Sequence, residues 1–246
     1  MEPCNSVLPV GDSPVHFFSE RPLPSLKIHD VITEMKGVFG MLRNPEHTDS
    51  VFDIEDGLRH SEATKLSMDY ILSCPEMGPM VRERYLRAKV PDLDALRKLP
   101  EGTLGRTYAD NLIHHGFDPD YFRKVEVIDD DSYLILRIRE THDLWHVMTG
   151  FLPNRIGEIG LKAVEVAQLR RPMAAIICCG GVMRYMLRDP DGLEIVIEAI
   201  SKGYQLGLGA KKLLAQKWEE RWEERVDDLR EELGVQPVTR EASGLG

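Results

Sequence analysis

The segment from His142 to His146, HDLWH, gathers residue types that bind metals, and Glu158 follows it after eleven residues. At 100° per residue on a helix, His142, His146 and Asp143 lie at about 0°, 40° and 100°, so their side chains project into one arc. Two imidazoles and two carboxylates form a mixed nitrogen and oxygen set that suits zinc, iron, manganese or cobalt. The spacing therefore predicts a divalent-metal site at His142, Asp143, His146 and Glu158, with open coordination positions if a carboxylate does not bind.

A purely structural role for these residues stays open at this point. A His-x-x-x-His pair is often two partly buried histidines that hydrogen-bond to their neighbours, and Asp143 can simply be solvated. Buried imidazoles and carboxylates need partners, however, and a metal supplies them. The other histidines favour a metal less, because His114 and His115 precede the helix-ending Gly116, and His29 with Asp30 lies on the first expected helix without further ligand residues nearby.

The elements that must position the site are predicted to be helices. Between Asp131, which can cap a helix, and Gly150, which can end one, apolar residues and histidines recur every three or four positions. The run Tyr-Leu-Ile-Leu within this stretch leaves a short strand as an alternative. A second helix begins after Asn154 and ends before Pro172, so two antiparallel helices with a short loop bring Glu158 level with the histidines.

The rest of the chain also favours helices. Five prolines in residues 1–24 predict an extended lead-in segment, and a first helix is expected from Ser25 to near Asn44. Further helical stretches are expected at residues 51–89 with breaks at Gly57 and Cys74, and at 91 onwards, 103–115, 173–187, 193–214 and 218–233. We therefore predict an all-α fold, a single-domain orthogonal helical bundle over residues 25–246.

Composition excludes several classes of protein. With 31 Lys+Arg against 41 Asp+Glu the net charge is −10, so nucleic acid is not expected as a partner. The four cysteines lack CxxC spacing, which predicts reduced thiols. The longest uncharged apolar run, Pro172 to Met183, holds 12 residues, too few to span a bilayer. The first residues read as neither a signal nor a transit peptide, so we expect a cytoplasmic protein.

Three segments carry a resemblance to a known family. They are Thr103 to Gly105 with Tyr108, LRIRETHDLWHVMTG at 136–150, and GEIGLKAVEVAQLRRPM at 157–173. They resemble the ubiquinone (coenzyme Q) biosynthesis protein usually numbered fourth in that pathway, the Coq-four family. The hallmark of that family is H-D-x-x-H, eleven residues, then E, which His142, Asp143, His146 and Glu158 match position for position. The tryptophan-containing stretch 218–233 also resembles the family's C-terminal region.

The resemblance implies a membrane-peripheral quinone-biosynthesis protein that binds a polyprenyl lipid or prenylated hydroxybenzoate in an inter-helix lipid groove. The resemblance also implies a divalent cation beside this ligand, with Zn²⁺ as first candidate and Mg²⁺ or Fe²⁺ as alternatives. Two roles stay open: metal-dependent C1 decarboxylation of the hydroxybenzoate, a lyase reaction, or a non-catalytic scaffold that organises the other quinone-biosynthesis proteins. A metal-dependent phosphohydrolase is disfavoured, because it needs an upstream His and a downstream Asp in a different register.

The resemblance also implies a setting for the protein. Eukaryotic members carry a mitochondrial transit peptide that these first residues do not resemble, so we expect a bacterial protein on the inner face of a membrane. A homodimer is one option for its assembly. If the organism makes a different prenylquinone, the substrate differs as well.

Three residues near the predicted site are candidates for binding substrate. Arg139, one turn before His142, either binds an anionic head group through its planar guanidinium or pairs with an acidic side chain. Lys162, four residues after Glu158, either lines the site or forms a surface pair with that carboxylate. Tyr108 either flanks the ligand or belongs to the core.

The segment from Leu169 to Arg184 is the best candidate for contact with a membrane. Arg170, Arg171 and Arg184 flank a run rich in Met, Ile and Cys, as they would in an interfacial helix. A core helix with solvated arginines at its ends is an equal alternative.

Overall fold

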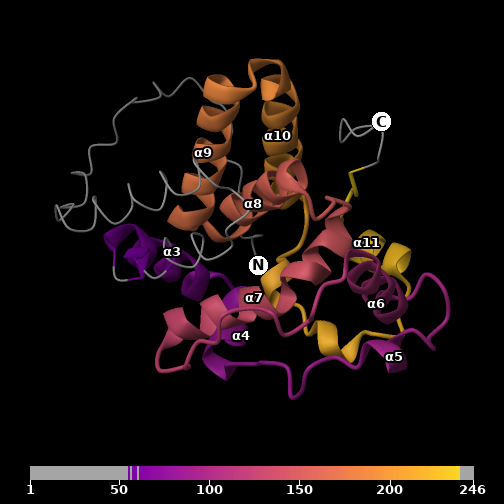
Figure 1. Cartoon of the computed structure of the whole chain (residues 1–246). Helices are drawn as coiled ribbons and strands as arrows, with labels where there is room; N and C mark the ends of the chain where they lie inside the picture. The colour runs from indigo at the N-terminus through magenta and orange to yellow at the C-terminus, as the bar shows by residue number, and fades with distance from the viewer. Residues whose placement is uncertain (1–54, 56, 60, 239–246) are drawn as a thin grey trace.

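The computed structural model describes residues 55, 57–59 and 61–238, and these form a single all-helical domain (Figure 1). The all-α, single-domain prediction is therefore confirmed, whereas the predicted lead-in at 1–24 and first helix at 25–44 lie outside the described residues. The α-helices are α3 (Glu62–Ser73), α4 (Met77–Glu83), α5 (Leu93–Leu96), α6 (Leu104–His115), α7 (Asp130–Thr149), α8 (Arg155–Leu169), α9 (Pro172–Arg188), α10 (Leu193–Gly209) and α11 (Val226–Leu233). One-turn 3₁₀ helices are η1 (Pro190–Gly192), η2 (Leu213–Ala215) and η3 (Trp218–Glu220).

Local capping explains why α7 and α8 begin and end where they do. The Asp129 side chain accepts a hydrogen bond from the backbone N–H of Ser132, the Ser132 hydroxyl accepts one from that of Asp129, and Gly150 ends α7 at φ +79°. The Asn154 side chain accepts from the backbone N–H of Gly157 at the start of α8. The predicted pair of helices is confirmed, and the strand alternative for Tyr-Leu-Ile-Leu is wrong because this run lies inside α7.

Helix α8 packs mainly on α10 and, to a lesser extent, on α9, and these two stand side by side at the top of Figure 1. Glycines permit the close approach of α10: a Cβ at Gly203 would lie 2.1 Å from the Gly160 carbonyl oxygen, and one at Gly207 would lie 2.7 Å from Ala167 Cβ. The contact between α8 and α7 is much smaller. The position of α8 relative to α7 therefore depends on more than direct helix packing.

The helix predicted over residues 218–233 is wrong in its first half. Trp218 lies in the single turn η3, and only α11 is helical beyond it. Between them, the carbonyl groups of Trp222 and Glu224 accept hydrogen bonds from the first two N–H groups of α6. Those N–H groups have no partner within their own helix, so the chain around Glu224 is used to satisfy them instead of continuing as a helix. The apolar residues Trp218, Leu229 and Leu233 are nevertheless buried, whereas Trp222 is half-buried.

The C-terminal end of α7 is held by α11. Arg230 donates from Nε to the Met148 carbonyl oxygen at 3.0 Å and from Nη2 to the Val147 carbonyl oxygen at 2.8 Å. A cation at a helix C-terminus pairs with otherwise unsatisfied carbonyl groups and with the helix dipole. The last turn of α7, which carries His146, is thereby fixed in place.

The segment predicted to touch a membrane is divided between core and surface. Arg171 and Met173 are buried, and Arg170 ends α8 with its guanidinium over the Tyr70 ring, so the first part of the segment is not an interfacial face. Large exposed apolar side chains begin only at Met183 and continue at Met186 and Leu187. Within the described residues no helix is long and apolar enough to cross a membrane. The three cysteines described, Cys74, Cys178 and Cys179, form no disulfide.

Candidate metal centre

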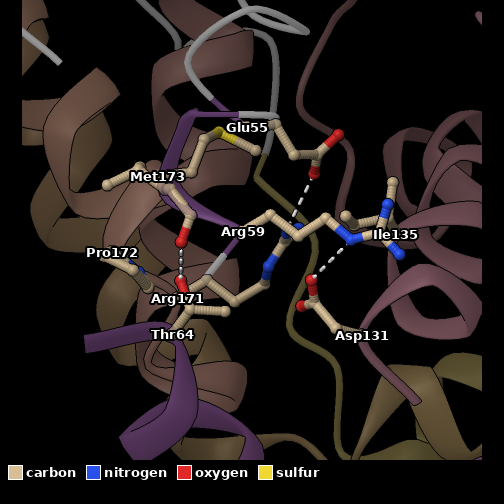
Figure 2. Close-up of a pocket in the computed structure, with 9 residues that line it drawn as sticks. Glu55, Arg59, Thr64, Asp131, Ile135, Arg171, Pro172 and Met173 are labelled. Carbon is tan, nitrogen blue, oxygen red and sulfur yellow. Dashed lines mark hydrogen bonds and ion pairs between the residues drawn. The ribbon is translucent and has the colours of Figure 1, made fainter. Parts of the chain in front are cut away.

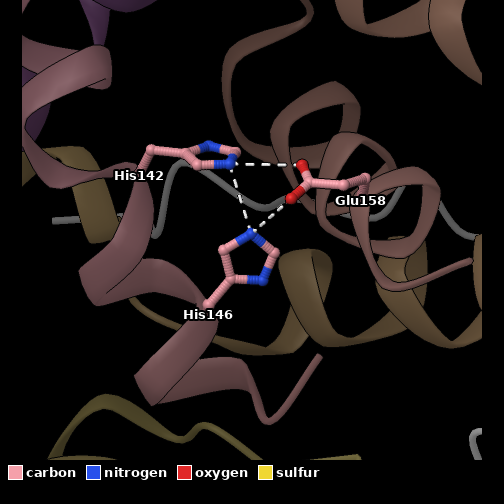
Figure 3. Close-up of side chains that lie close together, drawn as sticks. All are labelled: His142, His146 and Glu158. Carbon is pink, nitrogen blue, oxygen red and sulfur yellow. Dashed lines mark hydrogen bonds and ion pairs between the residues drawn. The ribbon is translucent and has the colours of Figure 1, made fainter. Parts of the chain in front are cut away.

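Three of the four predicted ligands converge between α7 and α8 (Figure 3). Glu158 Oε2 lies 3.2 Å from His142 Nε2, and Glu158 Oε1 lies 3.0 Å from His146 Nε2. The two Nε2 atoms are 3.2 Å apart. Two ligand atoms that are each about 2.1 Å from one ion are roughly 3.0–3.4 Å apart. The spacing of these donors therefore fits a single divalent cation.

The ring of His146 is oriented by a backbone contact. Its Nδ1 lies 2.9 Å from the carbonyl oxygen of Phe151, in the loop between α7 and α8. A carbonyl oxygen only accepts, so Nδ1 carries the proton and the lone pair of a neutral ring is on Nε2, directed at Glu158. The His142 ring stands nearly perpendicular to it, at an interplanar angle of 85°. The structure therefore presents a ligand-competent tautomer of His146.

The electrostatics of the cluster keep the carboxylate ionised. Burial acts to raise the pKa of Glu158, but the charges and hydrogen bonds of His142 and His146 hold that pKa well below its usual range. Burial acts to lower the pKa of His146, and Glu158 outweighs it, so the net shift is upward. His146 is buried, whereas the side chains of His142 and Glu158 are 28% and 41% exposed. One side of the cluster is thus open to a ligand.

Asp143, the fourth predicted ligand, is not part of this cluster. It lies half-buried on α7, and its negative charge contributes, after burial, to the raised pKa of Tyr108. A role for Asp143 as a ligand or as a neighbour that orients one stays a prediction. Tyr108 itself is buried in the core, with its ring 5.4 Å from that of Trp222.

Arg139 and Lys162 are both engaged in buried ion pairs. Arg139 contacts the carboxylate of Glu55, with Nε 3.1 Å from Oε2, and its Nη1 donates to the Arg123 carbonyl oxygen. Lys162 Nζ lies 2.7 Å from Glu165 Oε2. The predicted surface pair of Lys162 with Glu158 is therefore wrong. Lys162 is buried and pairs with Glu165, which faces it from deeper in the protein.

The sequence did not predict that Glu55, Glu165 and Arg171 lie near the site, and Arg171 was expected instead at a membrane-facing segment. Figure 2 shows Arg171 reaching Glu55, with Arg59 and Asp131 beside them around a small cavity. A signal was present in α8, where positions 158, 162 and 165 carry Glu, Lys and Glu on one helical face while the rest of the helix is mostly apolar. No comparable signal connects Glu55 to the site, because its partners are distant in sequence.

The fold and the cluster define an all-helical protein whose candidate metal site is shared by two consecutive helices. Residues 24–239 match the family described as coenzyme Q (ubiquinone) biosynthesis protein Coq4. The chain belongs to this family, and its role is in ubiquinone biosynthesis.

Individual relatives agree with this assignment. The chain is 33% identical over 234 residues to the ubiquinone biosynthesis protein coq4, mitochondrial, of Talaromyces stipitatus, covering 90% of this chain and 80% of the relative. It is 30% identical over 229 residues to the protein of the same name from Pyricularia oryzae, covering 89% and 74%. A crystal structure from Nostoc punctiforme, described as that of a ubiquinone biosynthesis protein, superimposes with a TM-score of 0.77 at 36% identity, covering 85% of this chain and 99% of that one.

Proposed function

We propose that this protein binds a polyprenylated hydroxybenzoate beside a divalent cation and removes its C1 carboxylate. The observation that carries the proposal is the convergence of His142, His146 and Glu158 at distances suited to one ion, on a face that is partly open. Family membership supplies the pathway. Two imidazoles and a carboxylate favour Zn²⁺, with Mg²⁺ and Fe²⁺ as the alternatives to be tested.

The chain's own residues prepare the site for such a reaction. His146 is held by Phe151 in the tautomer that directs Nε2 inward, and Glu158 stays ionised at neutral pH. A bound cation would supply Lewis-acid stabilisation of the charge that develops as carbon dioxide leaves. The electron pair of the broken bond stays on the ring carbon, which then takes a proton from solvent. Binding of the head group by Arg139 would require that side chain to release Glu55.

The prenyl tail is proposed to supply most of the binding energy, in a groove between helices. Burial of apolar groups contributes about 0.8 kcal/mol per CH₂, so affinity should rise with the number of isoprene units. The exposed Met183, Met186 and Leu187 at the end of α9 are our candidates for contact with the inner face of a membrane, from which such a lipid must be collected.

The decisive experiment is incubation of the zinc-loaded protein with a prenylated 4-hydroxybenzoate, followed by mass spectrometry for loss of carbon dioxide. We expect decarboxylation by the wild type, none by His146→Ala, and wild-type activity in His114→Ala, which replaces an exposed histidine outside the cluster. Binding of the substrate without turnover would instead support a scaffold that holds the intermediate for other quinone-biosynthesis proteins. If the protein neither binds the substrate nor turns it over, both roles are overturned.

A further inference from the structure

Five buried side chains form a continuous series of ion pairs beside the metal cluster. Lys162 Nζ is 2.7 Å from Glu165 Oε2, Glu165 Oε1 is 3.0 Å from Arg171 Nη1, and Arg171 Nη2 is 2.7 Å from Glu55 Oε1. The other oxygen of Glu55 contacts Arg139. Each of these side chains is 10% exposed or less. We call this set the buried ion-pair network.

Each end of the network lies one helical turn from a candidate ligand. Arg139 precedes His142 by three residues on α7, and Lys162 follows Glu158 by four residues on α8. Residues at these spacings share one face of a helix. Two members of the network lie outside both helices. Arg171 is the residue before α9, and Glu55 belongs to the segment ahead of α3. Because α7 and α8 have little direct contact, the network adds a connection between them to those made by their short loop and by the cluster itself.

The chemistry of the network favours fixed geometry over loose packing. Arg171 presents a planar fork whose two ends bind different carboxylates, which restricts both the distance and the angle between them. Burial acts to raise the pKa of Glu165, but Lys162 and Arg171 hold it below its usual range, so the carboxylate stays charged. Charges buried in this way carry a large desolvation penalty, and apolar side chains of the same size would fill the space without it.

We propose that the buried ion-pair network positions His142 relative to Glu158, with Glu165 and Arg171 as the positioning residues. Its value for metal binding rests on the proposed function, but its effect on the geometry of the cluster does not. In the part of the chain that the structure describes, Glu165 and Arg171 form their ion pairs with Lys162, with Glu55 and with each other, and not with the candidate ligands. They act through the helices that carry those ligands.

Glu165→Gln tests the proposal, because it keeps the shape of the side chain and removes its charge from both ion pairs. Loss of a side chain that hydrogen-bonds a metal ligand typically weakens metal binding by about 10–100-fold. Because Glu165 acts one step further from the ligands, we expect Glu165→Gln to bind Co²⁺ more weakly by up to about tenfold, the lower end of that range, with an altered d–d absorption spectrum. Glu198→Gln, which removes an exposed ion pair with Lys202 on α10, is the matched control and should keep the wild-type affinity and spectrum.

A second variant keeps the proposal testable if Glu165→Gln does not fold. Arg171→Lys keeps the positive charge but replaces the planar fork with a single ammonium group, so one of the two carboxylates loses its geometry. Arg171→Lys should also weaken Co²⁺ binding and alter the absorption spectrum, but less than Glu165→Gln does. Circular dichroism establishes that each variant is folded before its Co²⁺ titration.

The ¹⁵N signals of the His142 and His146 imidazoles in metal-free protein give a readout that needs no metal. They report the contacts of both rings with Glu158, and we expect them to shift in Glu165→Gln and to stay in place in Glu198→Gln. Wild-type signals, affinity and spectrum in the folded variants would overturn the positioning role. If the wild type binds no Co²⁺ but its imidazole signals move in Glu165→Gln, the proposed metal function fails and the positioning role stands.

Discussion

The metal cluster and the buried ion-pair network use the same two helices and the same kinds of side chain, yet they differ in exposure. His142 and Glu158 in the cluster are 28% and 41% exposed, whereas no member of the network exceeds 10%. In the network, positive and negative groups alternate and each carboxylate oxygen already faces a cation. In the cluster, one carboxylate faces two imidazoles, and all three side chains can donate an electron pair to a metal ion.

This difference separates a site that can take a ligand from one that is already satisfied. The network has cations paired to its carboxylates, so a further ion would have to displace one of them. The cluster gathers lone pairs from His142, His146 and Glu158 at one point, an arrangement that a cation stabilises. Residue type alone would place both sets in the same category. The partners of each side chain distinguish them.

The largest expected effect comes from breaking the network. Arg171→Met leaves Glu55 and Glu165 buried without their shared cation, and removal of one partner from a buried ion pair costs about 3–5 kcal/mol. Urea denaturation should show a loss of this size. Lys202→Met, which breaks an exposed pair on α10, should cost about 0–1 kcal/mol. Equal losses in the two variants would contradict the distinction between buried and exposed pairs.

The second effect concerns the cluster. A cation that binds only the folded protein stabilises it by about 2.7 kcal/mol when the free ion is at 100 times its Kd. Zn²⁺ should therefore raise the free energy of unfolding of the wild type, and EDTA should reverse the change. His146→Ala lacks a ligand and should show no such response. A zinc response of wild-type size in His146→Ala would place the ion elsewhere on the protein.

A smaller effect is expected from substitution of Asp143, and its size tells whether Asp143 is a ligand. Because it stands outside the three-residue cluster, we expect Asp143→Ala to weaken Zn²⁺ binding only about tenfold, as loss of an orienting neighbour does. Isothermal titration calorimetry measures the change, with Asp69→Ala on the exposed face of α3 as control. Complete loss of binding would make Asp143 a direct ligand.

The smallest effect is expected at Asp129, which lies outside the buried ion-pair network, caps α7 and contacts Arg59. Hydrogen bonds from Ser132, ahead of the contribution of Arg59, lower its pKa to about 2. Since the folded pKa lies below the unfolded value of about 3.9, this stabilisation is present above pH 4 and is lost as the pH falls towards 2. Asp129→Ala should cost about 1 kcal/mol at neutral pH.

The partial exposure of Asp129 limits the electrostatic share of that effect. Asp129→Asn keeps a side-chain oxygen for capping and removes the charge, so it should retain most of the stability at pH 7. Thermal unfolding at pH 7 and at pH 3 separates the two contributions. A stability difference between the wild type and Asp129→Asn that is larger at pH 3 than at pH 7 would contradict the assignment.

Much of the fold could be predicted from short-range signals in the sequence. Thr103 and Gly116 bound α6, and Asn154 opens α8, because each cap satisfies backbone groups within a few residues of itself. The two histidines of the cluster are likewise related by helical spacing within α7 alone. Glu158 required only one further step, the short loop that reverses the chain.

The tertiary structure decided which partners distant residues meet. The sequence around Trp222 is compatible with a helix, but the unpaired N–H groups of α6 draw its carbonyl group into another role. Lys162 has acidic neighbours on both sides along α8, and Glu165 is the one it contacts, because Arg171 and Glu55 are gathered at that end of the helix. Capping and helical periodicity act over a few residues and are therefore encoded locally, whereas the pairing of buried charges depends on which helices the whole chain brings together.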